Sequence, residues 1–339
     1  MGNNRNLIVL GLVLVILVGG YVLTQDRRPD LDTTGGFVEL VEGTLSTDDV
    51  YTLSLSKGDE DGVTVVQRDG DWVVASHHDA PANLNKVRTL LGNLETVSGE
   101  LRSEDASVLD AYALDDPNAY HLEVLDESGT PMAALLIGKR SGSGCFVREP
   151  GSDRVMLADH NFLSDFGLWA EDRPAPKADL WIDMAVVKLE RDAVRTVELV
   201  TGDGPLVLTK EFVDLGSAAE DSTETLPDAD AYEWRVTGPE EFVASKTRAD
   251  GVLASMVSLR ARGLVGDTVL DEYGLGEAAR KAVVTLEDGT STTLRFGGVT
   301  PDDESLLYFQ VEGQPLVWTL PDYVAKNVFK SAEELKTES

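Results

Sequence analysis

A serine followed three residues later by a lysine is the first pattern in this sequence that could do covalent chemistry. Ser54-Leu55-Ser56-Lys57 has the Ser-x-x-Lys spacing of serine acylases, which need the serine at a helix N-terminus and the lysine one turn later. The residues around Ser54 instead alternate between polar and apolar, which predicts a strand. Because a strand places Ser54 and Lys57 on opposite faces, the pattern does not predict an acylase.

A glycine followed by two cations, in Gly138-Lys139-Arg140-Ser141, matches the last residues of a phosphate-binding loop. Such a loop needs a second glycine five residues before Gly138, and Ala133 stands there. It also opens a helix, whereas this stretch lies between two predicted strands. We therefore expect a hairpin loop here and no nucleotide site.

The four histidines could bind a transition metal only if the fold brought them together. They are His77, His78, His121 and His160. Adjacent histidines in an extended segment point to opposite sides, and no pair has the spacing of four that places two on one helix face. His77 and His78 are expected on an exposed loop before Asp79, and no metal site is predicted.

Runs of carboxylates such as Asp59-Glu60-Asp61 and Pro301-Asp302-Asp303-Glu304 could hold calcium. Neither has the alternating acidic spacing with a distal glutamate that makes a rigid calcium loop, so both are expected to be solvated turns. A glycosidase pair depends on the distance between two carboxylates in space, and the sequence singles out no pair. It therefore predicts no catalytic, cofactor-binding or metal-binding residue, no cofactor, and a protein that is not an enzyme.

Cys145 is the only cysteine in the chain. A single cysteine excludes an intramolecular disulfide and a multi-cysteine zinc site. It stands in Gly144-Cys145-Phe146-Val147, which has the pattern of the start of a strand. We therefore expect Cys145 to be a small core residue rather than a nucleophile.

Acidic side chains dominate the composition. The 339 residues include 60 Asp and Glu against 29 Lys and Arg, which gives a formal net charge of −31. Such a surface repels nucleic acid and anionic lipid headgroups, so no nucleic-acid partner is expected. The charge favours solubility over an acidic recognition surface. The hydrophobic content of 42% is compatible with the cores of about two domains.

An uncharged stretch of about 17 residues, Leu7 to Leu23, is just long enough to span a bilayer core. A cleaved signal peptide would need a small-residue cleavage site, which Gly19-Gly20-Tyr21 does not provide. A lipoprotein signal would need a cysteine after the stretch, and a buried core helix would have a polar face. We therefore predict an uncleaved transmembrane signal anchor. Its apolar residues are Leu7, Ile8, Val9, Leu10, Leu12, Val13, Leu14, Val15, Ile16, Leu17, Val18, Tyr21, Val22 and Leu23.

The region after the anchor is predicted to lie outside the cytoplasm. Residues 1–6 are too few for more than a short cytoplasmic tail, although the charges on the two sides of the anchor discriminate little between orientations. A juxtamembrane linker over 24–44 is expected to join the anchor to the rest. The prediction is a single-pass protein of the cell inner membrane whose C-terminal region is extracytoplasmic and, in a bacterium, periplasmic.

An internal repeat with a period of about 160 residues follows the anchor. Leu109-Asp110-Ala111-Tyr112-Ala113-Leu114 returns as Leu270-Asp271-Glu272-Tyr273-Gly274-Leu275. After each comes a predicted hairpin with a tight glycine-containing turn, from His121 to Gly138 in the first half and from Ala282 to Gly297 in the second. Further strand-like segments align in the same order, so we predict a duplication.

Each half also carries predicted helices at the same places. Apolar residues from Leu84 to Leu101 recur at helical spacing in the first half. A shorter stripe from Leu253 to Leu259, weakened by Gly251, occupies the same place in the second half. Asn161 to Leu168 is expected to form the helix that closes the first half, and Tyr323 to Leu335 the helix that closes the second.

The predicted fold class is therefore α+β. It consists of two tandem repeats, each an antiparallel sheet with a four-strand meander covered on one face by helices, after a single transmembrane helix. The first repeat is expected over 45–170 and the second over 191–335, joined by a linker over 171–190. An acidic, Ser/Thr-rich insertion at 214–230 is expected to be a surface loop.

This arrangement resembles the bacterial family called domain of unknown function 4340. The resemblance covers about residues 45 to 335 and implies a single-pass membrane protein without assigned enzymatic activity, often associated with gliding-motility-type ABC transporters. It supplies no catalytic residues. The motifs that carry it are the N-terminal anchor, Trp72-Val73-Val74, Leu90-Leu91-Gly92-Asn93-Leu94, Tyr112-Ala113-Leu114, and Leu136-Ile137-Gly138 leading to Phe146-Val147-Arg148.

Three functions are consistent with these predictions. The leading one is a non-enzymatic accessory or assembly subunit of an envelope complex such as an ABC-type transporter. Its partners would be the bilayer and a membrane protein such as a transporter permease. The alternative is an extracytoplasmic ligand-binding module that uses the cleft between the two repeats. A hydrolase is the least favoured.

Overall fold

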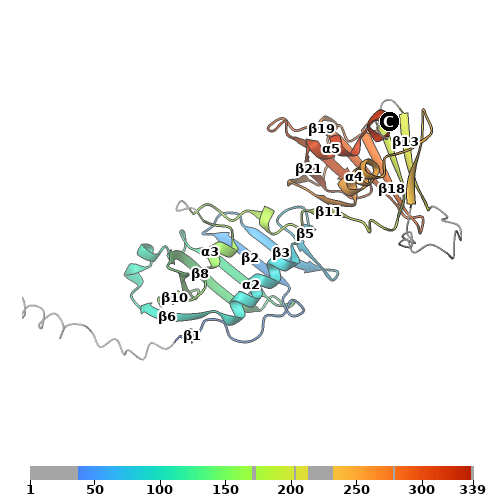
Figure 1. Ribbon diagram of the computed structural model, residues 1–339. Helices are drawn as coiled ribbons and strands as arrows, with labels where there is room; N and C mark the ends of the chain where they lie inside the picture. Colours follow the sequence, from blue (N-terminus) through green and yellow to red (C-terminus); the bar gives the residue numbers. More distant parts are fainter. Residues whose placement is uncertain (1–36, 170–172, 202–203, 213–231, 278, 337–339) are drawn as a thin grey trace, which may run out of the picture.

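A computed structural model describes residues 37–169, 173–201, 204–212, 232–277 and 279–336. The predicted anchor at 7–23 and the predicted insertion at 214–230 lie outside the described residues. Within the described ranges, every helix is too short or too polar to cross a bilayer. The fold described below therefore concerns the two repeats alone, and each of them is built mostly from antiparallel strands (Figure 1).

The first half forms one antiparallel sheet of ten strands, in the order β1-β6-β10-β9-β8-β7-β2-β3-β4-β5. Alternation explains the strands: in β2, Leu53 and Leu55 are buried while Thr52 and Ser54 lie on the other face. The predicted meander is confirmed as β7 to β10. The strands are β1 (Val38–Glu39), β2 (Thr52–Lys57), β3 (Val63–Arg68), β4 (Asp71–Val74), β5 (Ala80–Pro81), β6 (Ser98–Ser103), β7 (Tyr120–Leu125), β8 (Pro131–Ser141), β9 (Gly144–Arg148) and β10 (Val155–Ala158).

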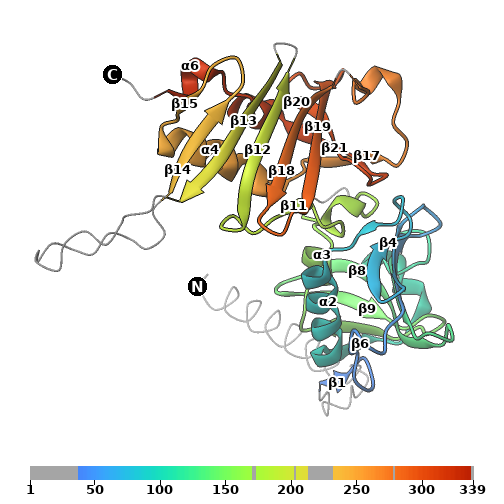
Figure 2. The ribbon, with the colours of Figure 1, turned by 90° about the vertical axis from the view of Figure 1, so that its right-hand side faces the viewer.

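The second half repeats this sheet strand for strand. Its nine strands run β15-β14-β13-β12-β18-β19-β20-β21-β17, and a separate pair, β11-β16, stands where β1 pairs with β6 in the first half (Figure 2). The strands are β11 (Ala185–Lys188), β12 (Val194–Thr201), β13 (Gly204–Phe212), β14 (Tyr232–Thr237), β15 (Phe242–Val243), β16 (Ser258–Arg260), β17 (Gly263–Gly266), β18 (Arg280–Leu286), β19 (Ser291–Val299), β20 (Leu306–Val311) and β21 (Val317–Pro321).

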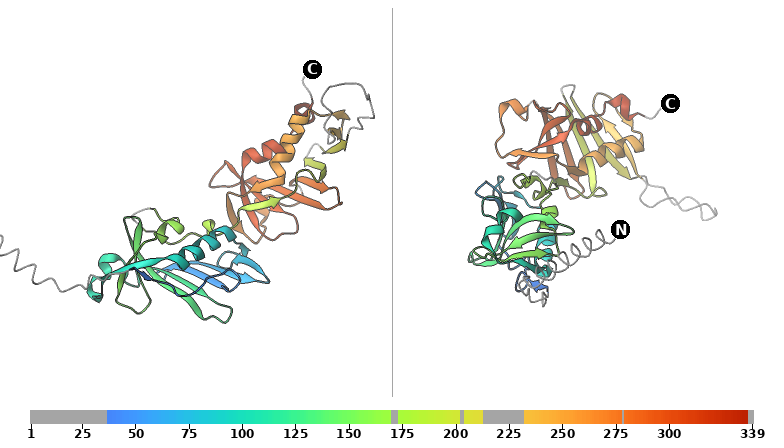
Figure 3. Two further views of the ribbon diagram at one scale, coloured as in Figure 1. Left: turned by 60° about the horizontal axis from the view of Figure 1, so that its bottom comes forward. Right: turned by 90° about the vertical axis from the view of Figure 1, so that its left-hand side faces the viewer.

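Helix α2 (Leu84–Thr96) covers one face of the first sheet, together with the short helix α3 (Phe162–Asp165) (Figure 3). Helix α2 begins at Asn83, whose side chain accepts a hydrogen bond from a backbone N–H in the first turn. The prediction that the helix continues to Leu101 is wrong, because residues 98–103 form β6. Pairing with β1 and β10 on both sides satisfies the backbone of β6. That pairing outweighs the helical spacing of the apolar residues.

Helix α4 (Lys246–Val257) takes the place of α2 in the second half. The single closing helix predicted over Tyr323 to Leu335 is two short helices, α5 (Asp322–Val328) and α6 (Ala332–Leu335). The break occurs at Ser331, whose hydroxyl and backbone N–H form a capping box with Glu334 and so start a new helix. The helix that closes the first half is likewise shorter than predicted.

The repeated Leu-Asp-x-Tyr motif forms a 3-10 turn in each half, η2 (Asp110–Tyr112) and η4 (Asp271–Tyr273). Each turn packs on the sheet face opposite the helices, where a glycine in the sheet lets it approach. A Cβ on Gly138 would lie 2.3 Å from the carbonyl oxygen of Tyr112, and one on Gly297 would lie 2.1 Å from that of Tyr273. Both glycines are therefore required by the same contact.

Residues 173–182, inside the predicted linker 171–190, pack on the first half. The backbone N–H of Asn83 donates to the carbonyl of Trp181 (2.6 Å). In the second half, the N–H of Ser245 at the same place before α4 donates to the carbonyl of Leu335 (2.9 Å). The segment around Trp181 therefore completes the first half as the segment around Leu335 completes the second.

Candidate functional site

The structure confirms that Cys145 is a core residue. It lies fully buried in β9, and its thiol donates a hydrogen bond to the backbone carbonyl of His160 (3.4 Å). Burial raises the pKa of the Cys145 thiol to about 12. The thiolate is therefore not populated near neutral pH, and Cys145 is not a nucleophile.

The four histidines lie apart, each in a local contact of its own. His77 Nδ1 contacts the hydroxyl of Ser76 (3.0 Å), and His121 Nε2 contacts the backbone carbonyl of Asp116 (3.0 Å). His78 and His160 contact the carboxylates of Asp267 and Asp165, at 3.3 and 2.7 Å respectively. Across the described ranges, no three histidine, cysteine or acidic side chains are placed to hold a metal ion.

The structure also shows where the Ser-x-x-Lys pattern, the glycine–cation pattern and one of the acidic runs lie. Ser54 and Lys57 lie on strand β2, as predicted. Gly138-Lys139-Arg140-Ser141 was expected as a hairpin loop, but these residues form the end of β8, and the turn follows at Gly142. The reason is that β9 pairs with β8 as far as Ser141. Asp303 accepts bonds from the N–H and hydroxyl of Ser305, which lowers its pKa and closes that acidic turn.

A buried arginine holds the 3-10 turn of the first half. Arg148 on β9 donates through Nε to the carbonyl oxygen of Leu114 (2.7 Å) and pairs with Asp116. Its side chain is almost completely buried, so removing it would leave these acceptors without partners. The sequence pattern predicts only that Arg148 lies in a strand, and its role here is structural.

In the second half, an arginine on the neighbouring strand holds the equivalent 3-10 turn. Arg295 on β19 donates to the carbonyl oxygen of Leu275 (3.2 Å) and pairs with Glu312. Arg295 lies opposite Gln310 on the neighbouring strand, in the pairing that Leu136 and Arg148 have in the first half. The arginine has changed strands while the contact it makes has been kept.

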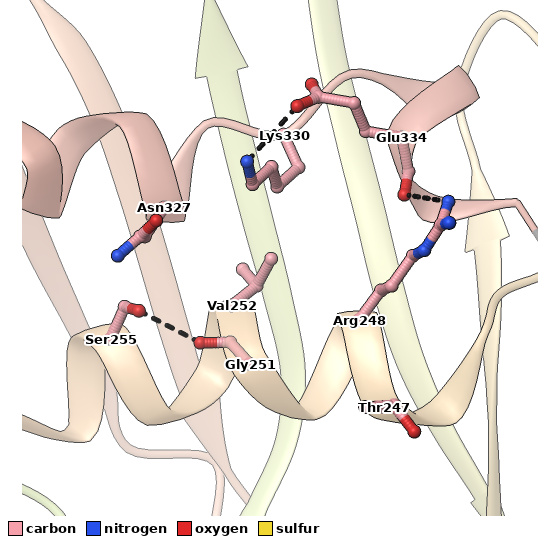
Figure 4. A pocket seen from close by; sticks show the side chains of 8 residues that line it. All are labelled: Thr247, Arg248, Gly251, Val252, Ser255, Asn327, Lys330 and Glu334. Carbon is pink, nitrogen blue, oxygen red and sulfur yellow. Dashed lines mark hydrogen bonds and ion pairs between the residues drawn. The ribbon is translucent and has the colours of Figure 1, made fainter.

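An open groove lies between α4 and the α5–α6 pair in the second half (Figure 4). Its volume is about 530 Å³. One side of the groove is the face of α4 that carries Thr247, Gly251 and Ser255, which are one turn apart. Apart from the helix's own backbone, no atom lies within 4 Å of the place where a Cβ on Gly251 would stand. The lining residues are Thr247, Arg248, Gly251, Val252, Ser255, Asn327, Lys330 and Glu334.

Hydrogen bonds fix the far wall of the groove. Arg248 reaches across from α4 and donates to the backbone carbonyls of Glu334 (2.8 Å) and Lys336 (2.9 Å). Lys330 pairs with the carboxylate of Glu334 (3.1 Å). The pKa of Glu334 is lowered to about 2, mainly by the hydrogen bond that it accepts from the N–H of Ser331 and next by the one from the side chain of Lys330. Glu334 therefore stays charged at neutral pH and keeps α6 capped.

The same place in the first half is closed by side chains. Asn93 on α2 donates to Asp165 on α3 (3.0 Å), and His160 contacts the same carboxylate oxygen (2.7 Å). We call Asn93, Asp165 and His160 the polar bridge. In the second half, Ser255 and Asn327 stand at the positions of Asn93 and Asp165. The Ser255 hydroxyl donates to its own helix, at Gly251 (2.9 Å), and the Asn327 side chain forms no hydrogen bond with a described residue (Figure 4).

One local feature of the sequence, Gly251, lies in this groove. In the sequence, Gly251 weakens the helix predicted for this part of the chain. A glycine in the middle of an exposed helix costs stability relative to alanine. We therefore infer that Gly251 serves packing or binding at this place. The remaining lining residues come from α4, α5 and α6, and no local pattern in the sequence brings these elements together.

Comparison with known proteins identifies the repeat. The family model described as "Domain of unknown function (DUF4340)" matches residues 72–227 and again residues 234–338. No curated protein and no solved structure matches the chain. The two adjacent matches confirm the internal repeat, and together they cover more than half of the sequence. The chain therefore belongs to the DUF4340 family and carries two tandem segments of it.

Proposed function

We propose that this protein is a non-enzymatic accessory or assembly subunit of an envelope complex, and that it binds a partner polypeptide in the groove of the second half. The observation that carries the proposal is the difference between the two helix pairs. The polar bridge closes the first one, whereas Ser255 and Asn327 leave the second one open.

The residues whose side chains could take part in catalysis support a binding role instead. Cys145 is buried as a neutral thiol, His160 and Asp165 serve the contact between two helices, and Arg148 holds a backbone turn. A catalytic group must reach a bound substrate, and these groups point into contacts within the protein. The groove itself offers amide, hydroxyl and charged groups whose chemistry is that of recognition.

The shape of the groove favours a polypeptide. The small residues along the α4 side of the groove, Thr247, Gly251 and Ser255, let another backbone approach α4 closely. On the rim, Asn327 offers an amide, and Lys330 and Glu334 offer opposite charges within 3.1 Å of each other. An extended or helical segment can satisfy such groups through its own backbone and side chains.

The membrane setting of the proposal comes from the sequence. The apolar stretch 7–23 is predicted to anchor the chain in the inner membrane, with the two repeats outside the cytoplasm. The family resemblance implies a partner of the ABC-transporter kind, such as a permease. A tethered chain searches for a partner in the same membrane at high effective concentration, so even a modest groove contact becomes effective.

Filling the groove tests the proposal. We expect Gly251→Leu to leave the protein folded, because the space beside Gly251 is open and leucine favours a helix by about 0.5–1 kcal/mol over glycine. The same change at Gly92 in α2, where the space is also open, is the matched control. The tagged full-length protein is purified in mild detergent, and its partners are quantified. Loss of a partner from the Gly251 variant alone supports the proposal, and unchanged recovery contradicts it.

A small-ligand binding module is the second candidate function. The volume of the groove, about 530 Å³, is in the range of small-molecule sites. This candidate places the ligand within the second half rather than between the repeats. A ligand would raise the melting temperature of the wild-type protein and not that of the Gly251→Leu variant, whereas a partner subunit would be recovered as a protein.

A further inference from the structure

The segment from Ile182 to Ala185 connects the two halves, and its first two residues pair with the first half. Ile182 forms an antiparallel bridge with Ala82, and the N–H of Asp183 donates to the carbonyl of Pro81 (2.7 Å). Pro81 belongs to β5, the last strand of the first sheet. The backbone of Ile182 and Asp183 therefore lies along the outer edge of that sheet.

The next two residues pair with the second half. The carbonyl of Met184 accepts a hydrogen bond from the N–H of Ala261 (2.7 Å), and Ala185, the first residue of β11, pairs with Arg260. Figure 1 shows β5 and β11 close together where the two halves meet. Each residue of this described segment is thus paired with one half or the other. A flexible linker, by contrast, needs residues whose backbone is free.

Asp183 is bonded to both halves at once. Its N–H donates to Pro81 of the first half, as described above. Its carboxylate accepts from the N–H of Ala185 (2.9 Å) and from Lys188 Nζ (2.7 Å), both on β11 of the second half. These bonds fix the direction in which the chain leaves the first sheet and enters β11.

Apolar side chains of the segment join the packing of the two halves. Ile182 is buried, and Met184 is partly buried against the same hydrophobic cluster. That cluster is continuous and includes core residues of both halves, such as Leu90 on α2 and Leu253 on α4. Because a close-packed interior transmits a displacement rather than absorbing it, we expect the two halves to move together.

A second contact between the halves lies away from this segment. His78, in the turn before β5, has its Nδ1 3.3 Å from a carboxylate oxygen of Asp267, which follows β17. Both side chains are about half exposed, at 44% and 53%, so this pair adds little stability. It adds geometry, because the connecting segment meets β16 and this pair lies beside β17. Two separate contacts oppose a rotation that one contact alone would allow.

We propose that residues 182–185 form a rigid joint, in which Asp183 sets the angle between the two halves, so that the halves behave as one body. The contacts described above carry the joint by themselves. Its role rests on the proposed function: a rigid body holds the groove of the second half at a set place relative to the first half. A partner polypeptide then meets the groove in one orientation, without the cost of ordering a flexible link.

Distances between two spin labels test the joint in the full-length protein. The labels are attached at Arg88→Cys on α2 and Ala254→Cys on α4, which are exposed positions, whereas the native Cys145 is fully buried. Double electron–electron resonance measures the width of the distance distribution. The reference is a pair within the first half, Asp71→Cys with Arg88→Cys. We expect the pair that spans the joint to give a distribution as narrow as the reference pair.

Variants of the joint should broaden this distribution. Two glycines inserted between Asp183 and Met184 should at least double its width, because they add a flexible link while both sets of pairings stay possible. Asp183→Ala removes only the carboxylate bonds and should broaden the distribution less. The matched control inserts the same two glycines after Gly129, in the turn between β7 and β8, and should leave the width unchanged.

The other outcomes overturn the proposal in distinguishable ways. A wild-type distribution as broad as that of the insertion variant shows that there is no rigid joint. A wild-type width in Asp183→Ala overturns the role of Asp183. Partner recovery from the insertion variant should fall several-fold, and full recovery would contradict the role of the joint in binding. Failure of the proposed function appears instead as unchanged recovery from Gly251→Leu, and it leaves the distance measurement valid.

Discussion

The two halves of this protein have the same strand order but use it differently. In the first half, the polar bridge of Asn93, Asp165 and His160 closes the space between the helices. In the second half, the equivalent residues Ser255 and Asn327 leave that space open. The sheet and its turn are thus what the duplication has kept, and the helix layer is where the halves have diverged. We expect function to lie where they differ.

The largest difference between the halves should appear at their equivalent tryptophans, Trp72 and Trp234. Trp234 is fully buried and donates to Asp250 (2.9 Å), whereas Trp72 is 8% exposed. Trp234→Ala should cost about 4 kcal/mol of unfolding free energy, through the cavity and the loss of one of the two hydrogen bonds that Asp250 accepts from Trp234 and Tyr232, and Trp72→Ala should cost less. Denaturant unfolding of the full-length protein measures both. A larger cost at Trp72 would contradict this ranking.

The next effect should be equal in the two halves. Gly138→Ala and Gly297→Ala each push a Cβ against a backbone carbonyl of the 3-10 turn, so each should cost about 3 kcal/mol, at the upper end for overpacking. Gly92→Ala, in open space on α2, is the control and should not destabilise. Unfolding curves in which only one of the two glycine changes destabilises would show that the turns are not equivalent.

Exchanging the helix contacts should convert one half toward the other. Asp165→Ala removes the acceptor of Asn93 and His160 and should cost about 2 kcal/mol. In the second half, Ser255→Asn with Asn327→Asp should build the missing bond, stabilise the protein by about 1 kcal/mol and block the groove. Unfolding free energy and partner recovery are both measured. If the double variant recovered the partner in full, the groove would not be the binding site.

The smallest effect concerns the cap of α6. The described 3-10 turn Ala178–Leu180, which takes the place of α6 in the first half, has no side-chain cap. The pKa of Glu334 is lowered to about 2 from an ordinary value of 4.5. Its stabilising contribution is therefore complete above the ordinary value and is lost as the pH falls from there toward 2. Because Glu334 is largely exposed to solvent, we expect less than about 1 kcal/mol. Wild type should lose its advantage over Glu334→Gln as the pH falls from about 4.5 to about 2, and a constant difference would contradict this.

The duplicated core could be predicted from the sequence because its signals are local. The Leu-Asp-x-Tyr turn and the glycine-containing hairpins are each written within a few residues, and the family match confirms the repeat. The end of α2 could not be predicted. Leu101 continues the helical spacing, but it belongs to β6, whose partners β1 and β10 lie far away in the sequence.

The candidate site was predictable only in part for the same reason. Gly251 carried a local signal, as a glycine in an amphipathic helix. Whether the neighbouring space is open depends on pairs such as Asn93 with Asp165 and Ser255 with Asn327, whose members are 72 positions apart in each half. Contacts between residues so far apart in the sequence follow from the fold, and the local spacing of residues does not predict them.

The most direct test of the central claim compares Gly251→Leu with Gly92→Leu in the full-length protein. Both changes add the same side chain at a helix position with open space beside it, and only the first fills the groove. Partner recovery in mild detergent, normalised to folded protein, is the measurement. The proposed function predicts that recovery falls at least tenfold for Gly251→Leu and stays at the wild-type level for Gly92→Leu. Equal recovery from both variants would contradict it.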